Sequence, residues 1–222
     1  MSRWLYLSYP IHTNTPIYGN AEPFLSVPVR SINDGDICNT QRWTLTNHLG
    51  THIDFPRHFV ENGITFKNYP PDFWICRNLG VIDLSPVLPE YIITPENLHM
   101  DTLPHDLELL FIKTGFSRFR QDPSYVFNNP VFVPGIASAL RKQCPHLRIF
   151  GFDTISLSSW TNRSLGREAH KAFLDHDNPI LILEDVDLSA VDQKTDILQV
   201  IVAPLAVYEA DAAPCLILSE VS

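Results

Sequence analysis

The sequence predicts an α/β fold of the mixed α+β kind, in which one mixed β-sheet is flanked by helices. Short apolar runs of strand length, rich in Ile, Val, Leu and Phe, recur along the 222 residues. Helical patterns lie between some of these runs but do not alternate with them strictly, which argues against a doubly wound fold. The length suits one sizeable domain, so we expect a single domain over residues 1–222.

The apolar runs give the positions of the expected strands. These cover residues 4–7, 25–29, 79–84, 109–112, 147–152, 180–183, 197–202 and 215–218. Helices are expected at 94–98, 134–144 and 165–176, because each begins or ends at a proline or a capping residue. The segment 118–133 is expected to be a long loop that forms a pocket wall or a subunit contact.

Composition and charge narrow the class of protein. The formal net charge of −9 argues against a nucleic acid or an anionic membrane as partner. No apolar run is long enough to span a bilayer, and the N-terminus has no pattern of a signal peptide. The four cysteines are scattered without a C-x-x-C pair and are expected to be reduced thiols, as in a cytoplasmic protein.

The most informative segment places His48, His52, Asp54 and His58 within eleven residues. Imidazoles and a carboxylate at this density are the donors that a divalent metal requires. In a strand, alternate side chains share one face, so His48, His52 and Asp54 would converge, with Gly50 leaving room beside them. Pro56 would then end the strand, so His58 could serve the site without being a ligand. The alternative is a polar structural strand.

Further donors are expected elsewhere, since three ligands leave a metal incompletely coordinated. His170 lies in the expected third helix, and Glu184 follows a buried apolar strand, where an unpaired carboxylate is costly. Each has a plainer interpretation. His170 could be a surface residue of its helix, and Glu184 could begin a solvated acidic turn that continues through Asp185 and Asp187.

The segment from His48 to His58 resembles the H-x-G-T-H-x-D-x-P-x-H signature of the metal-dependent cyclase/hydrolase family at every position. That family includes bacterial kynurenine formamidase and isatin hydrolase. Weaker similarities follow in the same order along the chain, and none of them is specific alone. They lie at residues 7–10, 15–19, 113–116, 151–154, 170–186 and 210–214.

The resemblance implies a swivelling β/β/α cyclase-like fold and a site with one or two divalent metals per chain, zinc or manganese. His48, His52 and Asp54 would bind the first metal, and Asp54 and Glu184 would bridge to a second metal held by His170. His58 would donate and accept protons. The resemblance also implies a homodimer or homotetramer.

Two departures from the family pattern affect the prediction of the substrate more than the prediction of the metal site. The related formamidases carry a tryptophan where this chain has Tyr18, which precedes Gly19 and Asn20. The spacing from His170 to Glu184 is also longer by about two residues, judged from the aligned apolar segment. Tyr18 and Phe59 are the candidate substrate-binding residues, and Phe66 and Trp74 are further candidates for an apolar pocket.

The expected activity is hydrolysis of a carbon–nitrogen bond in a small aryl or cyclic amide by a metal-activated water, with His58 as general acid–base. Two alternatives remain at this point. A dehydrating cyclase or a lactonase could use the same metal site. A non-catalytic protein could hold a structural metal, although structural zinc sites are usually rich in cysteine and this cluster has none.

Overall fold

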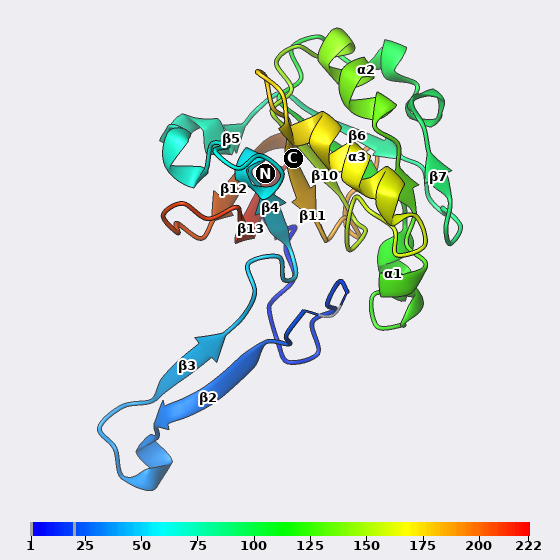
Figure 1. Ribbon diagram of the computed structural model, residues 1–222. Helices are drawn as coiled ribbons and strands as arrows, with labels where there is room; N and C mark the ends of the chain where they lie inside the picture. The colour runs from blue at the N-terminus through cyan, green and yellow to red at the C-terminus, as the bar shows by residue number, and fades with distance from the viewer. Residues whose placement is uncertain (1, 20) are drawn as a thin grey trace.

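A nine-stranded mixed sheet forms the centre of the computed structural model, which describes residues 2–19 and 21–222. Met1 and Asn20 lie outside the described residues. The strand order is β5-β12-β13-β4-β11-β10-β8-β6, and β1 pairs with β13 (Figure 1). The strands are β1 (Arg3–Tyr6), β4 (His52–Asp54), β5 (Ile75–Cys76), β6 (Leu79–Asp83), β8 (Leu109–Lys113), β10 (Ile149–Phe152), β11 (Leu181–Glu184), β12 (Ile197–Pro204) and β13 (Ala212–Val221).

Parallel and antiparallel pairs occupy different parts of this sheet. Strands β6, β8, β10 and β11 are parallel, whereas β4 and β13 join the sheet as antiparallel neighbours. The parallel strands β10 and β11 are buried throughout, as continuous apolar strands covered on both faces should be. Helix α2 (Gly135–Gln143) lies between β8 and β10 in sequence, and α3 (Arg163–Leu174) between β10 and β11.

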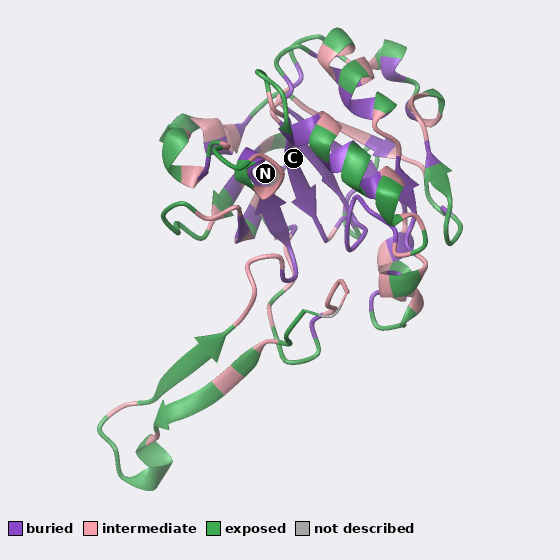
Figure 2. Ribbon diagram, in the orientation of Figure 1, coloured by how far each residue is buried: buried purple, intermediate pink, exposed green. Residues whose placement is uncertain are grey.

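The two longer helices pack on each other and cover the parallel part of the sheet. Ile136 and Leu140 of α2, and Ala169 and Phe173 of α3, are spaced one turn apart and are buried. The ring of Phe173 stacks on Phe150 of β10 at 4.9 Å between centroids. Figure 2 shows the resulting buried layer of strands beneath helices that are exposed on their outer side.

The predicted mixed α+β architecture is confirmed, and the eight predicted strands and the two longer predicted helices are present within a few residues of their expected ends. The segment 94–98 is only a 3-10 helix, η5 (Pro95–Leu98), because His99 follows in the left-handed region at φ 44°. No helix among the described residues is long and apolar enough to cross a membrane.

The prediction of a long loop over 118–133 is wrong. This segment contains the end of η7 (Phe116–Phe119), the short helix α1 (Ser124–Phe127) and the strand β9 (Val131–Phe132), which pairs with β7 (Ile92–Ile93). Tyr125 and Val131 are fully buried. Part of the segment is therefore packed in the interior, although Phe127 is 44% exposed.

A two-stranded hairpin projects from the body of the molecule (Figures 1 and 2). It consists of β2 (Leu25–Arg30) and β3 (Thr40–Thr44), with η1 (Ile32–Asp34) at its tip. Strand β3 was not predicted because its sequence, TQRWT, has no apolar run. Other 3-10 turns complete the chain: η2 (Pro56–His58), η3 (Phe66–Asn68), η4 (Pro71–Trp74) and η6 (Met100–Thr102).

Candidate metal centre

The short strand β4 carries His52 and Asp54 into the middle of the sheet. It pairs with β11 on one side and β13 on the other, so both residues are buried. In the register with β11, His52 lies directly opposite Glu184. Directly opposed residues of an antiparallel pair have neighbouring side chains. The His52 Nε2 atom accordingly lies 3.4 Å from Glu184 Oε2 and 3.5 Å from Asp54 Oδ1.

His48 reaches the same place by a different route from the one predicted. Strand β4 begins only at His52, so His48 does not share a strand face with Asp54. Gly50 has φ 64°, and this left-handed conformation turns the chain between the two histidines. His48 Nδ1 then lies 3.0 Å from Asp54 Oδ1. The predicted convergence is therefore present, but Gly50 acts through its backbone conformation rather than by leaving space.

Helix α3 brings His170 to the opposite side of the cluster. Its Nε2 atom lies 3.4 Å from Glu184 Oε1 and 3.7 Å from Asp54 Oδ2. Gly166, one turn earlier, allows the helix this close approach, since a Cβ there would lie 2.5 Å from Ser158 Cα. The suggestion that His170 is a surface helix residue is thus excluded, because its side chain is buried.

Backbone carbonyls set the tautomers of the two buried histidines. The Nδ1–H of His52 donates to Gly50 O at 2.8 Å, and the Nδ1–H of His170 donates to Gly166 O at 2.8 Å. A carbonyl can only accept, so Nδ1 carries a proton in each ring, and Nε2 is the atom that faces the carboxylates and would bind a metal once it is deprotonated. This is the orientation of a metal-ligating histidine held by an outer hydrogen bond.

Three polar atoms at the centre of the cluster lack an aligned hydrogen-bond partner. Both carboxylate oxygens of Asp54 and the Nε2 atom of His52 are buried, and no described residue is aligned to hydrogen-bond with them. Buried charged oxygens without donors are costly unless a cation pairs with them. Glu184 Oε1 is partly satisfied, since it accepts from Leu157 N at 2.7 Å and Ser156 Oγ at 3.2 Å. The donor set therefore fits a divalent metal.

Mutual attraction governs the ionisation of the cluster. Burial favours the neutral form of His48, but Asp54 and Asp211 overcome this effect and raise the pKa of the imidazole to about 10. Burial would likewise raise the pKa of Glu184, but His170 and His52 hold it well below its usual range. The carboxylates are thus ionised, and a cation that binds here must displace protons from the histidines.

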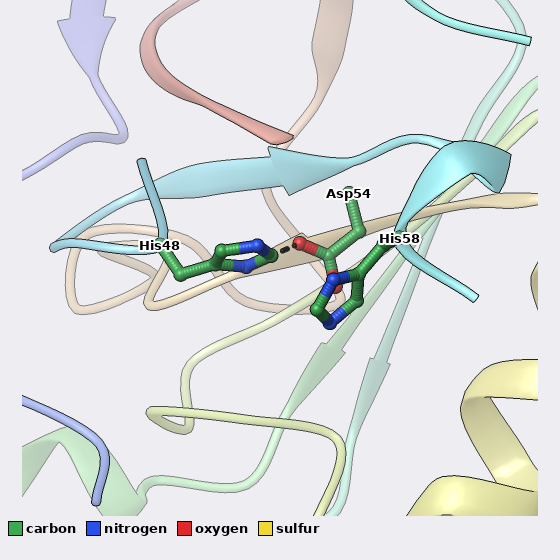
Figure 3. Close-up of side chains that lie close together, drawn as sticks. All are labelled: His48, Asp54 and His58. Atoms are coloured by element: carbon green, nitrogen blue, oxygen red, sulfur yellow. Dashed lines mark ion pairs between the residues drawn. The ribbon is translucent and has the colours of Figure 1, made fainter. Parts of the chain in front are cut away.

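His58 follows Pro56 in the turn η2. Its side chain contacts Asp211, a residue for which the sequence predicted no role. Its Nδ1 atom lies 3.2 Å from Asp211 Oδ2, and the same oxygen lies 3.0 Å from His48 Nε2. Asn47 Nδ2 donates to the other oxygen of Asp211 at 2.6 Å. Figure 3 shows His48 and His58 beside the carboxylate of Asp54. The segment 210–214 was matched to the family, but nothing local indicated that Asp211 would reach these histidines.

Two sets of donor atoms are close enough to share a cation. One consists of His48, Asp54 and His58, and the other of His52, Asp54 and Glu184, with all donor atoms of a set within 4.8 Å of one another. Asp54 belongs to both sets. His58 is thus near enough to be a ligand as well as an acid–base group.

The cluster lies at the floor of an open cavity of about 850 Å³. Tyr18 and Phe59 line this cavity, as predicted, together with the unpredicted Trp160. Phe66 and Trp74 do not line it, since their rings stack on each other at 5.6 Å in the core. Two arginines of α3, Arg163 and Arg167, also line the cavity and were not singled out from the sequence.

The acidic turn after Glu184 is not solvated as expected. Asp185 is buried. Its carboxylate accepts hydrogen bonds from Arg120 Nη2 at 2.7 Å and Nε at 3.0 Å, and from the Tyr125 hydroxyl at 2.5 Å. Thr51 donates its hydroxyl to Asp185 O at 2.6 Å, which connects this turn to the loop before β4. Asp185 therefore supports the strand end that presents Glu184.

A known protein family matches most of this chain. The profile of a family described as "Putative cyclase" matches residues 5–159, about two thirds of the chain, including the whole segment from His48 to His58. The chain belongs to this cyclase family. His170 and Glu184 lie beyond the matched residues, so their place in the cyclase site depends on the geometry above.

Curated relatives cover nearly the whole cyclase chain. The kynurenine formamidase of Bordetella avium (strain 197N) is 25% identical, with 96% of each chain covered. That of Bacillus cereus is 26% identical, with 96% of this chain and 95% of the relative covered. Among solved structures, isatin hydrolase A from Labrenzia aggregata has a TM-score of 0.82 at 19% identity, covering 99% of this chain and 94% of its own. A potential metal-dependent hydrolase with cyclase activity has a TM-score of 0.78 at 22% identity, covering 99% and 98%.

Proposed function

We propose that this cyclase-family protein is a metal-dependent hydrolase that cleaves the carbon–nitrogen bond of a small aryl or cyclic amide. The observation that carries the proposal is the cluster that lines the cavity, where both oxygens of Asp54 and the Nε2 of His52 are buried without an aligned hydrogen-bond partner among the described residues. The names of the relatives support an amide substrate, because kynurenine formamidase and isatin hydrolase both act on such bonds.

The residues that would hold the metal are His48, His52, Asp54, His170 and Glu184. Asp54 lies between the two donor sets, so one or two ions are compatible with the arrangement. The set has imidazoles and carboxylates but no thiolate, which suits zinc or manganese. When bound, such an ion acts as a Lewis acid that polarises the substrate carbonyl and lowers the pKa of water.

His58 is proposed as the group that moves the proton. With Nδ1–H donated to Asp211, its Nε2 remains free to accept a proton from the attacking water and to return it to the leaving nitrogen. A base oriented by a carboxylate is a recurring arrangement in hydrolytic sites. Histidine suits both transfers because its ordinary pKa of about 6.5 is near neutral pH.

Tyr18 and Phe59 are proposed to contact the substrate. Phe59 stacks on the ring of His170 at 5.0 Å between centroids, which places an apolar face beside the metal ligands. Burial and the charge of Glu184 raise the pKa of Tyr18 to about 12, so its hydroxyl keeps its proton. That hydroxyl is buried and has no hydrogen-bond partner among the described residues, so it can donate to a bound amide.

The test is metal analysis combined with a substrate panel. Protein purified without a histidine tag should carry zinc or manganese, and the panel should include N-formyl aryl amides, isatin, lactones and simple esters. Turnover of the amides or isatin supports the proposal. Turnover of lactones alone would indicate a lactonase on the same site, and metal-free protein with full activity would contradict the proposed mechanism.

We also propose that the protein is a homodimer or homotetramer and that it is located in the cytoplasm. The hairpin of β2 and β3 exposes Val29 by 60% and Trp43 by 65%, although an isolated two-stranded hairpin is at best marginally stable in water. The four cysteines are free thiols, as expected in a reducing compartment. Light scattering after gel filtration should give a mass above that of one chain, and Trp43→Lys should lower it, while Leu88→Lys, exposed elsewhere, should not.

A further inference from the structure

We propose that Arg163 and Arg167 form a carboxylate-binding site at the mouth of the cavity, so that the enzyme selects aryl amides that carry a carboxylate and no ammonium group. This inference rests on the proposed amidohydrolase function and names its substrate class. It starts from two guanidinium groups that the mechanism above does not use.

The position of the arginines follows from helical geometry. Arg163, Arg167 and His170 lie at i, i+4 and i+7 of α3, so they share one face of the helix. All three line the same cavity. At a rise of about 1.5 Å per residue, Arg167 is ~4–5 Å and Arg163 is ~10 Å from His170 along the helix axis. A planar substrate whose amide lies at the cluster would therefore extend its far end toward the two guanidinium groups.

Both guanidinium groups are available to a ligand. Neither makes an ion pair or a side-chain hydrogen bond within residues 2–19 and 21–222, whereas Arg120 is held by Asp185 and Arg141 by backbone carbonyls. Arg163 stacks on the ring of Trp160, with its Cζ 3.4 Å from the ring centroid. This stacking holds the flat face of the guanidinium and leaves its N–H edge free, which is the edge that binds a carboxylate in a bidentate manner.

The charges around the cavity give the site its selectivity. Among the described residues that line it, the only carboxylates are Asp54 and Glu184, and both belong to the metal cluster. None of the other described lining residues is a carboxylate that could pair with a substrate ammonium, which would instead face two cations. A zwitterionic amino-acid amide should therefore bind less well than an amide with a single carboxylate.

The kinetic test compares a charged amide with its neutral counterpart. The substrates are 4-formamidobenzoate and formanilide, which differ by a carboxylate at the far end of the ring, with N-formylkynurenine as the zwitterion. The proteins are the native chain, Arg163→Gln/Arg167→Gln and, as a charge-matched control, Lys142→Gln/Lys194→Gln, which removes two exposed positive charges outside the cavity. We expect the native protein to prefer 4-formamidobenzoate. The double variant should lose about ten- to a hundred-fold in kcat/KM on it, mainly through KM, and nothing on formanilide.

Other results would overturn the inference. An equal loss on both substrates in the double variant would mean a structural role, and a native preference for formanilide or N-formylkynurenine would refute the selectivity. Arg163→Lys/Arg167→Lys should recover part of the lost activity, because the charges are restored without the bidentate geometry.

A binding measurement separates this inference from the proposed function. Calorimetric titration with benzoate and with benzamide requires no turnover, at equal metal content in every protein. The double variant should bind benzoate about ten-fold more weakly than the native protein and benzamide equally. If benzoate binding is unchanged, the carboxylate site is refuted whether or not the protein hydrolyses amides. If no amide is hydrolysed but benzoate binding falls, the reaction is wrong and the carboxylate site is upheld.

Discussion

The Nδ1 atom of His58 lies 3.2 Å from Oδ2 of Asp211, a residue 153 positions further along the chain. The same oxygen lies 3.0 Å from Nε2 of His48. One carboxylate thus orients both the proposed proton carrier and a proposed metal ligand, and Asn47 holds the carboxylate in turn. This arrangement links a residue that would hold a metal to the residue that would transfer the proton.

Asp211→Asn should lower kcat by about ten- to a hundred-fold and weaken metal binding by a similar factor, since outer hydrogen-bond partners typically matter to that extent. The protein should still bind metal at full stoichiometry when it is saturated. Steady-state kinetics and metal titration provide the measurement. Glu209→Gln, which removes an exposed partner of Lys67 in the same turn, is the matched control and should change neither quantity.

His58→Ala should keep the fold and the metal but lose about 10²–10⁴-fold in turnover, as the loss of a general acid–base usually does. Metal content by mass spectrometry and turnover on a responsive amide are measured together. The exposed His146→Ala is the control and should behave as the native protein. Metal lost along with activity would instead make His58 a ligand.

Two neighbouring acidic residues should have different effects. Glu184→Gln should lower the affinity for metal with little loss of stability, because its side chain faces the histidines of the cluster. Asp185→Asn should lower the free energy of unfolding by about 3 kcal/mol, because it leaves the buried Arg120 without its partner. Metal titration and urea unfolding would reveal the contrast. Asp187→Asn, which changes a capping contact to Ser189, should affect neither strongly.

Metal uptake should release protons and should strengthen as the pH rises. Without a metal, the neighbouring carboxylates raise the pKa of His48 to about 10, so its imidazole is protonated at neutral pH. A ligand must be neutral, so binding displaces that proton, and the apparent affinity should increase between about pH 6 and pH 9. Calorimetry in buffers of different ionisation enthalpy counts the protons. A binding enthalpy independent of the buffer would contradict the predicted release.

Tyr18→Trp should change the substrate preference at constant metal content. Tyr18 lines the cavity, and its edge contacts the ring of Trp160 at 6.1 Å between centroids, so its replacement reshapes the cavity without touching the proposed ligands. Relative kcat/KM across the N-formyl amides and isatin is the measurement, with metal analysis of each protein. Identical preferences across the panel would mean that Tyr18 is only a packed loop residue.

Local sequence patterns were sufficient to predict much of the fold and about half of the candidate site. Each apolar run became a strand because burial and β-propensity act over a few consecutive residues. His52 and Asp54 could be placed on one strand face, and His58 beyond it, for the same reason: alternation and the break at Pro56 are properties of adjacent residues. The hairpin strand β3 was missed because its polar sequence carries no such signal.

The remaining features depend on contacts between distant parts of the chain. The register that sets His52 opposite Glu184, the approach of α3 at Gly166, and the pairing of Asp185 with Arg120 all join segments that are far apart in sequence. The reach of Asp211 to His58 is of the same kind.

The sequence by itself thus identified the proposed metal ligands, the proposed proton carrier and the runs that form the sheet, because side-chain type and short-range periodicity are local. Only the tertiary structure decided how they meet: Gly50 turns the chain between His48 and His52, Asp211 contacts two histidines, and two arginines line the same cavity as the cluster. The physical reason is that strand register and helix docking are selected by the packing of the whole core, and no single segment contains that information.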